Sequence, residues 1–166
     1  MNWVKYIIIT LLFFLFAVLQ TSFLPYFNIA GSTPSLIFIL FFILIFFETP
    51  LSSEGFFMAI IAGFFADIFL PSFFGLSIIA FLIIYLANKL AGHFLREGQE
   101  KYQIFYFIPV FLAGFAVYEF LLNNFNFGEG VLLSLAYSLF FACIGFYICK
   151  KLIGKSAADN QLRLFK

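Results

Sequence analysis

The chain has 166 residues, of which 64% are hydrophobic and only 10% charged, and its mean hydropathy is +1.11. Soluble domains average about 45–50% apolar and about 25% charged residues, so the composition excludes an ordinary soluble domain and predicts a protein that crosses a membrane several times. The net charge of +1 carries little information, because in such proteins the position of each charge matters more than the sum. We expect no nucleic-acid partner.

Six hydrophobic segments are candidates for membrane-spanning helices, since a bilayer core about 30 Å thick requires about 20 helical residues. They cover residues 4–24, 33–49, 54–71, 73–91, 104–122 and 131–150. The first lacks a small-x-small cleavage site and is interpreted as an uncleaved helix. We therefore predict an all-α integral membrane protein. Residues 1–150 form a single six-helix transmembrane bundle in this prediction, and residues 151–166 form a short basic cytoplasmic tail.

The distribution of lysine and arginine predicts the orientation of this bundle. Six helices place both termini, the second loop and the fourth loop on the same side of the membrane. That side receives all nine basic residues, namely Lys5, Lys89, Arg96, Lys101, Lys150, Lys151, Lys155, Arg163 and Lys166. Because basic residues concentrate in cytoplasmic loops, we predict that both termini are cytoplasmic.

Asp67 is the most costly residue in these segments, because a carboxylate at the centre of a membrane helix costs roughly 2.5–3.5 kcal/mol on insertion scales. Counted from Gly55 at 1.5 Å per residue, Asp67 lies about 18 Å into the bilayer. No basic side chain of the chain is expected to reach it. It must be protonated, hydrogen-bonded by neutral neighbours, exposed to water in a cavity, or paired with another protein.

Small residues identify the face of this helix that packs against protein. Gly55, Ala59, Gly63 and Asp67 recur every four residues, and such ridges let helix backbones approach closely. We predict that this ridge serves helix packing or binds the transmembrane helix of a partner. The sixth segment has a similar ridge and is expected to be its neighbour; that ridge consists of Ser134, Ser138 and Ala142.

Three further polar residues are expected at about the depth of Asp67 and form a candidate outer polar cluster: Gln20, Ser77 and Glu119. They are the neutral or acidic neighbours that Asp67 could meet, either in the packed bundle or in a cavity open to the outside.

The sequence offers no constellation for metal binding or catalysis. Cys143 and Cys149 are six residues apart and fall on different faces of a helix, and the only histidine, His93, is placed in a charged loop. Intramembrane hydrolysis would need paired aspartates or a Ser/His arrangement in the membrane. We therefore predict no catalytic residue, no metal, no cofactor and no enzymatic activity.

The order of the motifs resembles the rod shape-determining protein MreD family. This chain has Leu19-Gln20-Thr21-Ser22, then Gly31-Ser32-Thr33-Pro34-Ser35-Leu36, then Gly63-Phe64-Phe65-Ala66-Asp67, then Phe74-Gly75-Leu76. The family typically reads L-Q-x-S, G-x-x-P-D-L, G-F-x-x-G-L-x-x-D and P-L-G-L. Pro34 and Gly75 match their motifs, whereas Ser35 and Phe74 depart from them. The resemblance covers residues 15–80, and residues 100–166 match only in length, hydrophobicity and basic tail.

This resemblance implies a non-enzymatic scaffold subunit of the bacterial cell-elongation machinery, which determines rod shape and directs peptidoglycan synthesis at the inner (cytoplasmic) membrane. The expected partners are the lipid bilayer, an MreC-like single-pass membrane protein and, indirectly, MreB-like filaments and peptidoglycan synthases. The family is also similar to the S components of vitamin transporters, which share a six-helix fold.

Two alternatives stay open at this point. The first is an S-component-like binder of a small molecule such as a vitamin, with an outward-facing cavity near Gln20, Asp67 and Glu119. Its weakness is that S components have an Ala-xxx-Ala docking pattern on the first helix, where this chain has only Ala17. The second is a proton-coupled carrier that uses Asp67 or Glu119.

Overall fold

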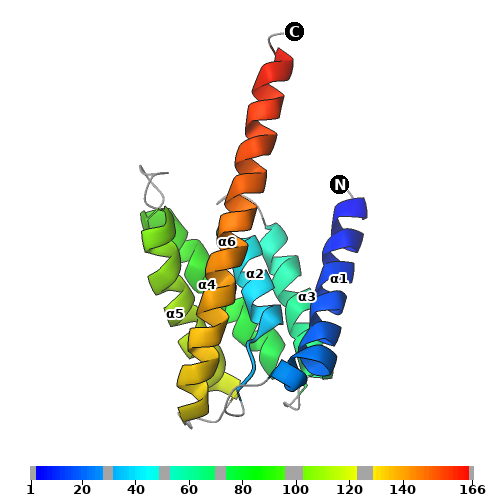
Figure 1. The fold of residues 1–166 in the computed structure, drawn as a ribbon, viewed down its shortest axis with the longest axis vertical. Coiled ribbons are helices and arrows are strands. Elements are labelled where there is room, and N and C mark those ends of the chain that lie inside the picture. Colours follow the sequence, from blue (N-terminus) through cyan, green and yellow to red (C-terminus); the bar gives the residue numbers. More distant parts are fainter. Residues whose placement is uncertain are drawn as a thin grey trace.

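The computed structural model describes residues 3–27, 32–48, 53–69, 74–95, 103–122 and 129–164, and helices are the only extended secondary structure within these ranges (Figure 1). The predicted number of six α-helices is confirmed for the described residues. Their bounds are α1 Trp3–Val18, α2 Leu36–Phe46, α3 Glu54–Phe69, α4 Leu76–Leu95, α5 Gln103–Leu122 and α6 Glu129–Leu164. Helix α1 continues into a π-helical turn, η1 (Leu19–Phe23), and a 3-10 turn, η2 (Leu24–Phe27).

Two helical stretches among the described residues are long and apolar enough to cross a membrane, Trp3–Phe27 and Gly130–Lys151. Shorter apolar stretches cover Leu36–Phe46, Leu76–Ala91 and Tyr106–Leu122. The N-terminus and the far end of α6 lie at the same end of the bundle (Figure 1).

Helix α2 lies at the centre of the bundle and contacts each of the other five α-helices. Its sequence, LIFILFFILIF, is apolar on every side, which is typical of a fully buried helix, and nine of its eleven residues are buried. With eleven residues it is only about 16 Å long. The predicted segment 33–49 was therefore too long. Pro34 disfavours a helical conformation at Thr33, and the backbone before Leu36 is not helical.

Phenylalanine rings on one side of α2 interlock with rings on α5. The pairs meet nearly edge to face, an arrangement that aromatic rings prefer, with centroids 5.3, 5.1 and 5.1 Å apart: Phe38 with Phe115, Phe42 with Phe111, and Phe46 with Phe107. All six side chains are buried. The phenylalanine content of the chain thus forms much of the core around α2.

The small-residue ridge of α3 packs against α4. A Cβ atom added at Gly63 would overlap the Cα of Ile78 and lie 2.7 Å from the Ile78 nitrogen, and one added at Gly55 would lie 2.5 Å from the ring of Tyr85. Ala59 is completely buried on the same side. The ridge is therefore filled by a helix of the same chain.

The ridge of α6 has a different neighbour from the one expected. Ser138 Oγ accepts a hydrogen bond from the Ser35 amide at 3.1 Å, and Ser134 Oγ donates to the Thr33 carbonyl at 3.1 Å. Ala142, on the same ridge, is buried. The prediction that this ridge neighbours the third helix was wrong, because α6 uses it to contact α2 and the residues that precede α2.

Two helices extend further than the hydrophobic segments indicated. Helix α6 was expected to end near residue 150 but continues to Leu164 and projects well beyond the bundle (Figure 1). Helix α4 continues to Leu95 and includes His93, which the sequence placed in a loop. Hydropathy locates the apolar part of a helix, whereas hydrogen bonding continues the helix into the polar residues that follow.

Candidate functional site

Asp67 accepts hydrogen bonds from two backbone amides at the start of α4. Its Oδ2 lies 2.7 Å from the Gly75 nitrogen and its Oδ1 lies 3.0 Å from the Ser77 nitrogen. These amides belong to the first turn of a helix, where N–H groups have no partner within the helix and where the helix dipole favours a negative charge. Asp67, which is only 6% exposed, thus acts as a helix cap supplied from the preceding helix.

The conformation of Gly75 makes this cap possible. Its φ is +96°, a left-handed conformation that glycine adopts without a steric penalty. Its carbonyl accepts the first bond of α4, from the Ile79 amide at 3.1 Å. The sequence named Ser77 as a neighbour of Asp67, but the contact is made by the Ser77 backbone. The donor at Gly75 was missed, although a glycine directly before an apolar helix was its signal.

Gln20 performs the same task for α2. The π-helical turn at the end of α1 contains Gln20, whose Oε1 accepts a hydrogen bond from the Ile37 amide at 3.0 Å. Gln20 is buried, so this bond lies away from water. The side chain of Ser35, the residue that precedes the helix, makes no capping bond, and the Ser35 amide donates to Ser138 instead.

Helix α6 satisfies further polar groups in the non-helical residues before α2. Besides the contacts of Ser134 and Ser138, Ser32 Oγ donates to the Gly130 carbonyl at 2.8 Å. Sequence analysis treated the serines of α6 only as small packing residues. Their hydroxyl groups also provide hydrogen bonds to backbone that no helix or sheet satisfies.

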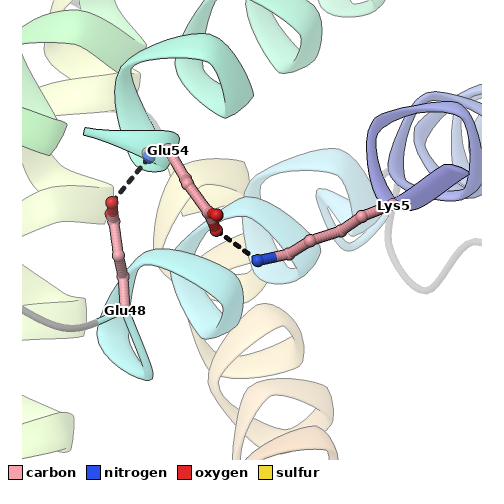
Figure 2. A network of polar contacts seen from close by, with 4 residues as sticks. Lys5, Glu48 and Glu54 are labelled. Carbon is pink, nitrogen blue, oxygen red and sulfur yellow. Dashed lines mark hydrogen bonds and ion pairs between the residues drawn. The ribbon is translucent and has the colours of Figure 1, made fainter. Parts of the chain in front are cut away.

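The third cap lies at the opposite end of the bundle. Glu48 Oε1 accepts a hydrogen bond from the Gly55 amide at 2.8 Å, and Glu54, the first residue of α3, forms an ion pair with Lys5 of α1 (Figure 2). The Lys5 and Glu54 side chains are 49% and 35% exposed, so solvent weakens this pair and we assign it little stability.

The remaining predicted residues lie near these caps. Pro34 is buried directly before α2. Glu119 is partly buried on α5, next to Tyr118. Gln20 contacts the start of α2 from the end of α1, whereas Ser77 lies at the start of α4, so these two outer polar residues belong to different caps.

The contacts described above stabilise the ends of helices. In the part of the chain that the structure describes, no group of three His, Cys, Asp or Glu residues lies close enough to hold a metal ion, and Cys143 and Cys149 are free thiols.

Comparison with known proteins finds no relative: no family model, no curated protein and no solved structure matches this chain.

We expect Gln20→Ala to destabilise the protein by about 1–3 kcal/mol, because the Ile37 amide would remain buried without its acceptor. The free energy of unfolding in a mild-detergent and denaturant titration measures this effect. Leu19→Ala is the matched control, since Leu19 occupies the same turn but is 36% exposed, and it should cost less. Equal losses in the two variants would contradict a capping role for Gln20.

Proposed function

We propose that the protein is a multi-pass membrane protein. Supporting this, large apolar side chains are exposed along α1 and along α6 between Leu132 and Ile148; among them are Trp3, Ile7, Leu11 and Phe140. Soluble proteins rarely expose apolar patches this extensive. Lipid would cover these side chains, while the polar groups that lipid cannot satisfy are engaged in the caps described above.

The arrangement of charged residues supports cytoplasmic termini. The start of α1 and the far end of α6 lie at the same end of the bundle (Figure 1). Lys5 is in the first turn of α1, Lys89 is in the second half of α4, and Lys150 and Lys151 are in the second half of α6. The side chains of Arg96, Lys101, Lys155, Arg163 and Lys166 lie outside the described part of the chain. In our proposal this end faces the cytoplasm of a bacterial cell.

Within this membrane setting, we propose that the protein is an MreD-like scaffold subunit of the cell-elongation machinery that binds an MreC-like single-pass partner. One observation carries the proposal. Gln20, Pro34, Asp67 and Gly75 come from separate motifs of the resemblance, and each of them helps to form the start of α2 or α4. If these motifs share a role in one architecture, their residues should lie at related positions in the fold. If the match were accidental, the four residues would have no reason to lie at the starts of the same two helices. Gly31, from the same motif as Pro34, lies outside the described residues.

The same contacts disfavour the small-molecule alternative. An S-component-like site would draw its specificity from polar side chains aimed into a cavity, and Gln20 and Asp67 were the candidates. Both direct their oxygens at backbone amides of the same chain. The α3 ridge is likewise occupied by α4, so the proposed partner binds at another surface.

Co-purification tests the scaffold proposal directly. The full chain carrying an affinity tag is expressed together with an MreC-like protein, and the complex is isolated from the solubilised membrane fraction. We expect the partner to be retained in near-stoichiometric amount, while an unrelated single-pass membrane protein at the same expression level is washed away. Equal retention of both proteins, or loss of both, would contradict the scaffold role.

A further inference from the structure

Helices α1 and α3 run side by side in the same direction, and two ring contacts fix their relative height. The ring of Tyr6 on α1 lies 6.1 Å from that of Phe57 on α3. Eight residues further along both helices, the ring of Phe14 lies 6.0 Å from that of Phe65. Because the same spacing separates the two contacts on each helix, α1 and α3 rise in step.

Helices α3 and α4 meet at the level where the α-helical part of α1 ends. In the register set by the ring contacts, Phe69 at the end of α3 lies level with Val18 at the end of α1. Helix α4 begins at about the same height, because the amide of Gly75, directly before this helix, bonds to Asp67. The backbone at Phe74 and Gly75 forms a turn and is not helical.

The apolar surface of α1 extends beyond this level. The chain continues through η1 and η2, where Phe23 and Phe27 are both more than half exposed. From Trp3 to Phe23 the exposed apolar side chains span about 30 Å at 1.5 Å per residue, which matches a bilayer core about 30 Å thick. The exposed apolar side chains of α3 run from Phe56 to Ile68, a span of only about 18 Å.

We propose that the outer leaflet is thinner beside α3 and α4 than beside α1, so that this face binds a locally thinned bilayer. Non-helical backbone does not face hydrocarbon, and the turn at Phe74, which is 71% exposed, therefore marks the outer edge of the hydrocarbon on this side. Tilting cannot remove the difference, because α1 and α3 rise in step. A bilayer adapts to a short apolar surface by thinning, at a modest cost per ångström. This inference rests on the proposal that the protein is a multi-pass membrane protein.

Quenching of single tryptophans by brominated lipids tests the inference. The full chain carries Trp3→Phe, which removes its one native tryptophan, together with Ile68→Trp or the matched control Leu19→Trp. Leu19 is also exposed and lies slightly further from the cytoplasmic end than Ile68. In dioleoylphosphatidylcholine vesicles, we expect lipid brominated near the headgroup, relative to lipid brominated near the chain end, to quench Ile68→Trp more strongly than Leu19→Trp. A bilayer of uniform thickness gives the opposite order, because Leu19 is then nearer to the outer surface.

A second pair, Ile7→Trp and Phe57→Trp, should give equal quenching ratios, because the two helices share the inner boundary. Equal ratios for Ile68→Trp and Leu19→Trp, or the opposite order, would overturn the inference and leave the multi-pass proposal standing. Loss of quenching in Ile68→Trp alone would also overturn it, since protein rather than lipid would then cover α3. An absence of quenching in all four variants would contradict the multi-pass proposal itself, and this inference with it.

Discussion

Asp67→Ala is expected to lower the free energy of unfolding by about 2–5 kcal/mol. The substitution leaves the amides of Gly75 and Ser77 without their acceptors. A buried donor that loses its partner costs about 1–3 kcal/mol; the Ser77 amide is buried, and the partly buried Gly75 amide should cost somewhat less. The first turn of α4 should become less protected from solvent, since its amides have no other partner within the helix. Unfolding in a mild detergent, followed by circular dichroism, measures the loss.

Two matched variants separate the cap from general effects of substitution in α3. Asp67→Asn keeps one acceptor oxygen and should lose about half as much stability as Asp67→Ala. Ile68→Ala removes a neighbouring side chain that is 52% exposed and should change stability by less than about 1 kcal/mol, because substitutions at exposed positions away from caps and cores have small effects. If Asp67→Ala were as mild as Ile68→Ala, Asp67 would not be a structural cap.

Gly63→Ala is expected to destabilise the protein by about 3 kcal/mol, and Gly63→Leu to prevent correct packing of α3 against α4. The added Cβ atom would meet the backbone of Ile78, which cannot rotate away as a side chain can, and overpacking in a close-packed interior typically costs 1–3 kcal/mol. Stability of the purified variants and their monodispersity in detergent measure the effect.

Gly145→Ala provides the control for this experiment. The Cβ atom added there would lie 2.5 Å from Ile43 Cδ1, the flexible end of a side chain, so a rotamer change can relieve the contact. We expect a loss of less than about 1.5 kcal/mol, the range of tolerated hydrophobic swaps. If Gly63→Ala and Gly145→Ala had equal effects, close backbone approach at Gly63 would not determine the α3–α4 interface.

The apolar segments predicted the number and order of the helices because each helix of this bundle has a long run of apolar residues. They predicted the ends of α2 poorly. At the start of α2 the Ile37 amide donates to Gln20, and just before it the Ser35 amide donates to Ser138. Contacts between residues so distant in sequence leave no periodic signal. Similarly, the ridge of α6 indicated close packing without indicating that its neighbour is α2.

The candidate site was predictable in its members but not in its chemistry. The cost of a carboxylate in an apolar segment identified Asp67, and its depth excluded a basic partner from the opposite end. The donors are backbone amides at Gly75 and Ser77, and every residue except proline has such an amide, so residue types alone cannot distinguish them. A glycine directly before an apolar segment was the only local clue, and the structure shows it in a left-handed conformation.

The central claim is that polar side chains within this apolar bundle cap helices that lie elsewhere in the chain. The most direct measurement is amide hydrogen exchange and chemical shift at Gly75 and Ser77, by NMR of the full chain in detergent micelles or nanodiscs, for the wild type and Asp67→Asn. We predict that both amides are protected in the wild type and that both shift and exchange faster in the variant, while the Ile79 amide, which bonds to the Gly75 carbonyl, stays protected. Unchanged shifts and exchange at Gly75 and Ser77 would contradict the account.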